Sequence, residues 1–148
     1  MLLCFDPGET RKAPGVGWAS FDLPSGDMVD FGQILNEDLV DLLRTIQPTL
    51  VICENYKNRP WKRGASNFSE NKTSQVIGAI RMWCELYDVP MVMQEPDNKD
   101  MGIMWSGTRV PKNHALSHQV DAYGHGVFYI VKNGIKPVSA YHKREVKI

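Results

Sequence analysis

The chain has 148 residues, of which 43% are hydrophobic and 23% charged, and this composition is typical of one globular domain. No apolar run approaches the roughly 20 residues that a membrane-spanning helix needs, which argues against a membrane-embedded protein. Net charge is zero, but residues 1–56 carry nine acidic and three basic side chains, whereas residues 57–148 carry eight acidic and fourteen basic ones. This asymmetry suits a polyanionic partner, although chance variation between solvated faces explains it equally well.

Three short apolar segments open the chain, at residues 1–6, 15–21 and 28–35. The turn-forming sequences Asp6-Pro7-Gly8 and Pro24-Ser25-Gly26-Asp27 follow the first and the second of them. Short apolar runs separated by such turn residues predict an antiparallel meander of three strands.

Helices and strands alternate in the remainder of the sequence. The spacing of apolar residues predicts helices at 39–46, 69–87 and 114–131, and strands at 49–53 and 90–93. Residues 94–113 show little periodicity and are expected to form a long, partly helical connection. The order βββαβαβα predicts an α/β fold with a mixed five-stranded sheet flanked by helices. We expect a single domain over residues 1–148, with a basic tail from about residue 136.

The cysteines and the N-terminal residues bear on the cellular compartment. Cys4, Cys53 and Cys84 each lie in an apolar run, which indicates buried thiols in a reducing compartment rather than a disulfide framework. The N-terminal sequence MLLCFDPG lacks the basic region and cleavage site of a signal peptide. A cytoplasmic location is therefore expected.

Three acidic residues occupy apolar surroundings. Asp6 ends the first predicted strand, Glu54 directly follows the buried run 50–53, and Asp121 lies between Val120 and Ala122 in the last helix. A carboxylate at the edge of a core must be paired, hydrogen-bonded or bound to a metal. Each acid alone is compatible with a structural role. Together, at neighbouring strand ends, they predict a site for Mg²⁺, which prefers clustered oxygen ligands.

Histidines extend this candidate site along the last helix. His118 precedes Asp121 by three residues and shares its helix face, so it is a candidate ligand of a second metal ion or a proton shuttle. His114 and His125 fall on the same stripe, which is also compatible with zinc. The sequence lacks the glutamate that follows the first histidine in zinc proteases, so zinc is the less favoured metal. His125, between two glycines, is interpreted as a packed histidine at a close helix contact.

The segment after Glu54 combines positive charge with aromatic side chains. Such a composition beside a proposed active site predicts contacts with DNA phosphates and stacking on an unpaired base. The alternative is a solvated loop in which Trp61 folds back onto the surface. The predicted DNA-contact residues in this segment are Tyr56, Lys57, Arg59, Trp61, Lys62 and Arg63.

Three segments, in order, resemble the RuvC-type Holliday junction resolvases. They are Asp6-Pro7-Gly8 with the following Gly15-Val16-Gly17-Trp18-Ala19, then Val51-Ile52-Cys53-Glu54, and finally His118-Gln119-Val120-Asp121-Ala122. The resemblance covers residues 1–131, and the length suits the short versions found in bacteriophages. The sequence departs from the family in a longer loop at residues 9–14 and in the poorly alignable segment 94–113.

The resemblance implies a ribonuclease H-like fold, a homodimer, and Mg²⁺ or Mn²⁺ as the cofactor. It assigns Asp6, Glu54, His118 and Asp121 as catalytic residues and metal ligands. It also makes Tyr56 the residue nearest in spacing to the aromatic side chain that wedges into the junction. Lys99 and Lys112 are the candidates for the family's basic DNA-binding residues in the segment 94–113.

The expected function is that of a structure-specific endodeoxyribonuclease that cuts Holliday junctions and other branched DNA. Two metal ions roughly 4 Å apart would orient the attacking water and stabilise the leaving oxygen. Two alternatives stay open, namely a nuclease on another substrate such as an RNA–DNA hybrid, and a non-catalytic protein that binds branched DNA. An actin-like ATPase is disfavoured, because no second phosphate loop follows Asp6. The helix 69–87, with Met82 and Trp83, is the candidate dimer surface, unless it is ordinary core.

Overall fold

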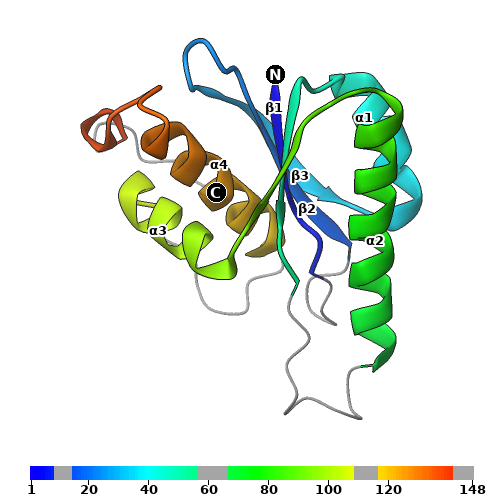
Figure 1. The fold of residues 1–148 in the computed structure, drawn as a ribbon. Coiled ribbons are helices and arrows are strands. Elements are labelled where there is room, and N and C mark those ends of the chain that lie inside the picture. The colour runs from blue at the N-terminus through cyan, green and yellow to red at the C-terminus, as the bar shows by residue number, and fades with distance from the viewer. Residues whose placement is uncertain (9–14, 57–66, 109–116, 142–148) are drawn as a thin grey trace.

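The computed structural model describes residues 1–8, 15–56, 67–108 and 117–141 of the chain. The strands are β1 (Leu2–Asp6), β2 (Val16–Phe21), β3 (Met28–Ile34), β4 (Leu50–Glu54) and β5 (Met91–Gln94). The helices are α1 (Leu39–Ile46), α2 (Asn67–Leu86), α3 (Pro96–Ser106) and α4 (Ser117–Lys132), with 3-10 turns η1 (Asn36–Asp38) and η3 (Val138–Ala140). These elements form one sheet with helices on both faces (Figure 1).

The five strands lie in the order β3-β2-β1-β4-β5. The meander β1–β2–β3 is antiparallel, while β1 pairs with β4 and β4 with β5 in parallel. The short turn before β3 suits an antiparallel neighbour, and the helices α1 and α2 supply the crossovers that parallel neighbours require. The predicted mixed sheet is therefore confirmed, with β1 at its centre and β4 beside it.

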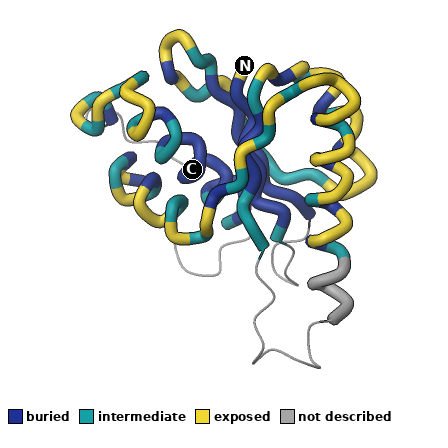
Figure 2. The backbone as a smooth tube through the Cα atoms, in the orientation of Figure 1, coloured by how far each residue is buried: buried dark blue, intermediate teal, exposed yellow. Residues whose placement is uncertain are grey.

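The two faces of the sheet are covered by different helices. Helices α1 and α2 pack on one face, and α3 and α4 lie on the other (Figures 1 and 2). Alternation along β1 divides its side chains accordingly: Leu3 and Phe5 join the core under α1 and α2, whereas Leu2 and Cys4 join the core under α4. All three cysteines are buried, as expected. Among the described residues, no helix is both long enough and apolar enough to cross a membrane.

Helix α3 gives bounds to the partly helical connection expected at residues 94–113, because residues 96–106 form a regular helix. Pro96 at its first position favours initiation, and Gly107, with φ of 71°, ends it in the left-handed conformation. The sequence of α3 carries no apolar stripe, so periodicity could not reveal it. Close backbone packing on α4 holds it instead, since a Cβ added at Gly102 would lie 1.8 Å from the Gly124 carbonyl oxygen.

Candidate functional site

The three parallel strands end in polar side chains at the same edge of the sheet. Asp6 ends β1, Glu54 ends β4 and Gln94 ends β5, and Glu54 and Gln94 are register partners. Cys4 and Ile52, two residues before Asp6 and Glu54, lie in the core beneath α4. Because side chains two apart in a strand share a face, Asp6 and Glu54 project toward α4.

Helix α4 approaches this edge closely because glycines remove side chains from the contact. A Cβ added at Gly17 in β2 would lie 2.0 Å from the carbonyl oxygen of His118. Further along the helix, a Cβ at Gly126 would lie 2.1 Å from the ring of Phe21. The missing side chains let the α4 backbone pack directly on the sheet, so that residues of its first turns reach the strand ends.

Asp6, His118 and Asp121 converge at this point. Each offers one ligand atom, and these atoms all lie within 4.8 Å of one another. The His118 Nδ1 lies 2.9 Å from Asp6 Oδ2, and the Gly8 amide donates a hydrogen bond of 3.0 Å to Asp6 Oδ1. Asp6 and His118 are buried, while Asp121 is partly exposed. Two carboxylates and an imidazole form a donor set that suits Mg²⁺ or Mn²⁺.

The charges of this cluster are crowded. Burial, together with the negative charges of Asp6 and Glu54, raises the pKa of Asp121 to about 7, although Lys99 opposes the shift. Burial would also raise the pKa of Asp6, but the hydrogen bond from His118 and the charge of Lys99 outweigh it and hold that pKa below its usual value. Near neutral pH Asp6 is therefore ionised, whereas Asp121 takes up a proton readily. A divalent cation would relieve this crowding, so the residues fit the implied metal.

Lys99 of α3 supplies positive charge to the same site. Its Nζ lies 2.9 Å from Glu54 Oε2 and 3.2 Å from Asp121 Oδ2. Burial lowers the pKa of Lys99, but the charges of Asp6 and the two bonded carboxylates raise it further, so the ammonium stays protonated. Glu54 is thus held by Lys99 and is not a member of the Asp6–His118–Asp121 group. The sequence proposed Lys99 only as a DNA contact, because the helix that carries it left no periodic signal.

His125 lies behind Glu54 and is completely buried. Its Nε2 lies 2.9 Å from Glu54 Oε2, and its Nδ1 lies 2.7 Å from Gln94 Oε1. The prediction of a packed histidine is confirmed, but the contact with Glu54 was missed. The spacing of four residues from Asp121 was the available signal. His125 does not belong to the candidate metal group, and His114 lies outside the described residues, so the described structure assembles no histidine stripe for zinc.

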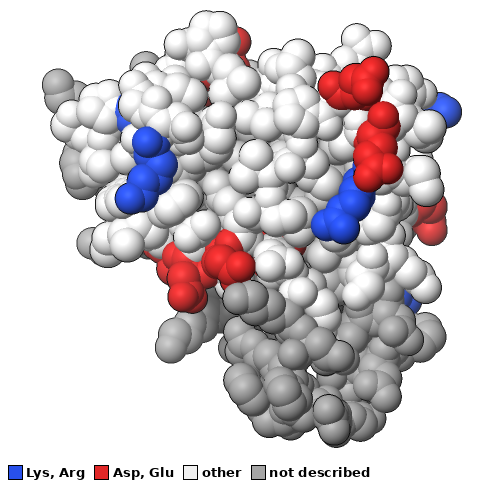
Figure 3. Space-filling view, viewed as in Figure 1, with Lys and Arg blue, Asp and Glu red and all other residues white. Residues whose placement is uncertain are grey.

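Two of the predicted DNA-contact residues, Tyr56 and Lys99, lie in the described part of the chain. Tyr56 is described and partly buried, and it directly follows Asn55, whose amide donates to the backbone of Gln94. The face drawn in Figure 3 carries separate small groups of acidic and basic side chains among the described residues. The predicted contacts that lie outside the described residues are Lys57, Arg59, Trp61, Lys62, Arg63 and Lys112.

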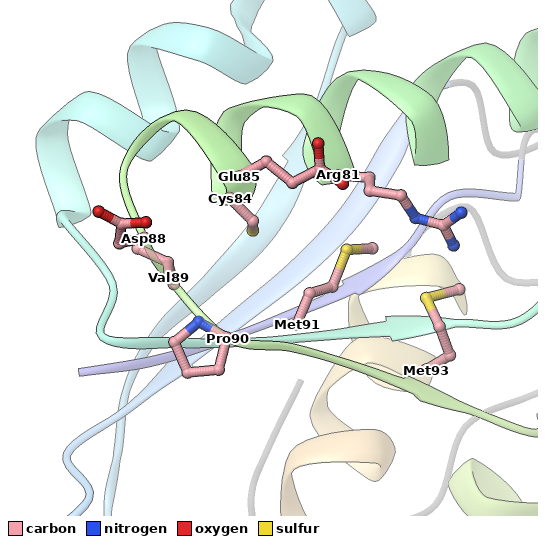
Figure 4. A pocket seen from close by; sticks show the side chains of 8 residues that line it. All are labelled: Arg81, Cys84, Glu85, Asp88, Val89, Pro90, Met91 and Met93. Carbon is pink, nitrogen blue, oxygen red and sulfur yellow. The ribbon is translucent and has the colours of Figure 1, made fainter.

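A cavity of about 630 Å³ lies between α2 and β5 (Figure 4). Cys84, Met91 and Met93 in its lining also belong to or pack against the core under α1 and α2. The cavity is therefore on the opposite face of the sheet from the acidic cluster and holds none of the predicted ligands. Its complete lining is Arg81, Cys84, Glu85, Asp88, Val89, Pro90, Met91 and Met93.

Comparison with known proteins identifies the fold of the chain. No protein-family model and no curated protein sequence matches the chain. Among solved structures, Thermus thermophilus RuvC in complex with a Holliday junction substrate matches with a TM-score of 0.62 and 14% identity, covering 90% of this chain and 96% of that one. A second Thermus thermophilus RuvC structure matches with a TM-score of 0.57, again at 14% identity and with the same coverage. The chain therefore has the ribonuclease H-like fold of RuvC, as its sequence resemblance implied.

Proposed function

We propose that the protein is a divalent-metal-dependent endonuclease that cuts branched DNA, four-way junctions in particular. The observation that carries the proposal is the convergence of Asp6, His118 and Asp121 at the carboxyl ends of the parallel strands. The same fold occurs in a RuvC structure solved with a Holliday junction, which supports branched DNA as the substrate class.

In this proposal, Asp6, His118 and Asp121 hold Mg²⁺ or Mn²⁺, and Glu54 completes the site from the neighbouring strand. Bound there, the metal would lower the pKa of a water and stabilise charge on the leaving oxygen. The chain's own contribution is to gather the donors in a partly buried place, where Lys99 balances their charge. The use of two ions, and the catalytic roles of these four residues, are expectations carried over from the sequence.

Substitution of the metal-binding acids tests the proposal. Asp6→Asn or Asp121→Asn, incubated with a labelled four-way junction and Mg²⁺, should lose cleavage by about 100-fold or more, because each removes a charged ligand. Asp41→Asn is a matched control, since Asp41 is exposed on α1 at the opposite face. Full cleavage by both Asp6→Asn and Asp121→Asn would overturn the metal-site assignment.

A panel of substrates separates this function from its alternatives. We expect the four-way junction to be cut faster than a flap, a linear duplex or an RNA–DNA hybrid. Preferential cleavage of the hybrid would identify a ribonuclease on the same fold. Tight junction binding without cleavage, unaffected by Mg²⁺ and by Asp6→Asn, would identify a non-catalytic binding protein.

The DNA contact is proposed to follow Glu54 in the chain. Tyr56 and Trp61 would stack on bases at the branch point, and the basic residues between and after them would contact phosphates. A Trp61→Ala variant should therefore weaken junction binding with little effect on the salt dependence, whereas a Lys62→Ala, Arg63→Ala variant should lower the slope of affinity against salt. Lys99 and Lys112 stay predicted DNA contacts.

A homodimer through α2 is part of the proposal. Met82 and Leu86, one turn apart on α2, are 60% and 72% exposed, and Tyr87 just beyond the helix end is 58% exposed, which leaves apolar surface at the C-terminal end of α2. Trp83, by contrast, packs against the core. Leu86→Glu should convert a dimer to a monomer in light scattering, and Val40→Glu on the exposed side of α1 is its control. A cytoplasmic location and a bacteriophage origin stay predictions of the sequence.

A further inference from the structure

His125 occupies a place in the site that the proposed metal ligands do not explain. It lies on α4, one turn after Asp121, and its side chain is inaccessible to solvent. Both ring nitrogens are nevertheless engaged, Nδ1 with Gln94 at 2.7 Å and Nε2 with Glu54 at 2.9 Å. A buried imidazole with two short polar contacts fixes the geometry of its partners, because breaking either contact would leave a buried polar group unsatisfied.

The two partners of His125 are themselves fixed by the sheet. Glu54 and Gln94 are register partners at the ends of β4 and β5, and the Asn55 amide donates to the Gln94 carbonyl at 2.7 Å. Gln94 is 5% exposed. The chain Gln94–His125–Glu54 therefore connects two strand ends and one helix, and the rigid elements on both sides limit the movement of Glu54.

The two carboxylate oxygens of Glu54 have different surroundings. Oε2 accepts from His125 Nε2 and from Lys99 Nζ, each at 2.9 Å. Within the part of the chain that the structure describes, Oε1 accepts no hydrogen bond. Oε2 is thus held by two donors, and Oε1 is the oxygen that can turn to a cation.

We propose that His125 is a positioning residue that, with Gln94, orients the Glu54 carboxylate for a divalent cation. The inference rests on the proposed metal-dependent function and deepens it. His125 is no ligand in this arrangement, because its two nitrogens already face Glu54 and Gln94. Hydrogen-bond donors behind a ligating carboxylate typically change metal affinity or activity by about 10- to 100-fold when they are removed.

The proposal specifies where a proton lies. Nε2 must carry hydrogen to donate to Glu54, whereas a proton on Nδ1 alone would set the Nε2 lone pair against the carboxylate. A neutral ring with hydrogen on Nε2 requires the Gln94 amide to present its NH₂ group to Nδ1, which a half-turn of the amide about its last bond achieves. Nitrogen-15 NMR of the metal-free protein should therefore show hydrogen on Nε2 of His125. Its absence there would overturn the proposal.

Metal binding without DNA tests the role itself. His125→Leu should weaken Mn²⁺ binding about 10- to 100-fold in calorimetry, and His125→Gln, which keeps an amide donor, should restore much of it. Val127→Ala is the matched control, because Val127 is buried on the same helix and in the apolar core. It should lower the melting temperature while leaving Mn²⁺ affinity within about twofold. Equal Mn²⁺ affinity in His125→Leu and wild type, or equal losses in His125→Leu and Val127→Ala, would contradict a positioning role.

The double variant Glu54→Gln, His125→Leu shows whether His125 acts through Glu54. In Glu54→Gln, His125→Leu should cause little further loss of Mn²⁺ affinity, because the carboxylate that it orients is gone. Independent, additive losses would overturn the inference. Failure of the proposed function is distinguishable: a wild type that binds Mn²⁺ but cuts no junction overturns nuclease activity alone. A wild type that cuts junctions while His125→Leu leaves Mn²⁺ binding unchanged overturns only the positioning role.

Discussion

The two faces of the sheet are built by different means. Helix α1 packs on one face through apolar side chains such as Leu39 and Leu43, in the manner of an ordinary amphipathic helix. Helix α4 meets the other face partly through glycine contacts, with its backbone against β2 and against α3. Side-chain packing needs only an apolar stripe and tolerates exchange among apolar residues. Backbone packing requires glycine, and it brings polar side chains close enough to the strand ends to form a site.

Breaking the backbone contact should have the largest effect. In Gly102→Ala, the added Cβ would lie 1.8 Å from the Gly124 carbonyl oxygen, so α3 and α4 must move apart. We expect a loss of about 3 kcal/mol or more in the free energy of unfolding, since overpacking against backbone cannot be relieved by a rotamer change. Urea denaturation measures it. Wild-type stability would show that the helices are not in this close contact.

The same variant tests whether the contact positions the site. Lys99 lies on α3, one turn before Gly102, and its ammonium contacts Glu54 and Asp121. Displacement of α3 should remove these ion pairs and change Mn²⁺ affinity in protein that is still folded at low temperature. Unchanged affinity despite lower stability would show that the site does not depend on α3.

The contrast between the faces also explains what could be predicted from the sequence. The amphipathic helix 39–46 and the apolar run before Glu54 carry their own patterns, and both were correctly located. The acids at the strand ends stood out because charge is unusual beside a core. Those signals are local, and the folding rules that join parallel strands at one edge then bring Asp6 and Glu54 together.

The predictions were incomplete where the role of a residue depends on contact rather than on a sequence pattern. Helix α3 has no apolar stripe, and its close approach to α4 depends on the backbone contact at Gly102. Because the sequence indicated only a partly helical connection there, without bounds, the partners of Lys99 could not be foreseen. The contact of His125 with Glu54 likewise depends on how closely α4 approaches the sheet, which glycine spacing alone does not specify.

Removing the carboxylate of Asp121 should have the next largest effect on the free energy of unfolding, and it should raise that free energy rather than lower it. The pKa of Asp121 is raised from 3.8 to about 7, so the folded protein binds more protons than the unfolded chain between those values. Stability therefore falls as pH rises from about 4 to about 7. Asp121→Asn should escape this loss. At pH 8 without metal, its free energy of unfolding should exceed that of the wild type by about 2 kcal/mol, after allowing for the lost Lys99 contact.

Denaturation at several pH values in the presence of a chelator measures this difference. The difference in the free energy of unfolding between the variant and the wild type should become smaller toward pH 4, where Asp121 of the wild type is protonated. Asp6 contributes in the other direction and in a lower window, because its lowered pKa stabilises the fold above about pH 4 and that stability is lost on acidification. An Asp121→Asn variant less stable than wild type at pH 8 would mean that Asp121 is not electrostatically strained.

Replacing the internal cation should have a smaller effect. Lys99→Met keeps the length of the side chain but leaves Glu54 and Asp121 without their ammonium partner. We expect the metal-free protein to lose about 1.5 kcal/mol, the lower range for a hydrogen bond to a charged group. Added Mg²⁺ should raise its melting temperature by more than it raises that of wild type, because the cation then neutralises the same carboxylates. An equal or smaller Mg²⁺ shift would show that Lys99 and the metal do not share this charge.

The smallest effect is expected on the face of the sheet covered by α1 and α2, where a glycine-to-alanine change should stabilise the fold. Gly78 is an exposed residue of α2, and a Cβ added there meets no atom within 4 Å. Alanine should therefore add up to about 1 kcal/mol of helix stability with no effect on Mn²⁺ affinity. Gly78 shares a helix face with Met82 and Leu86, so the measurement belongs in a Leu86→Glu background, where no second copy covers that face. Loss of stability there would mean that α2 also packs through a backbone contact, and the two faces would differ less than their glycines indicate.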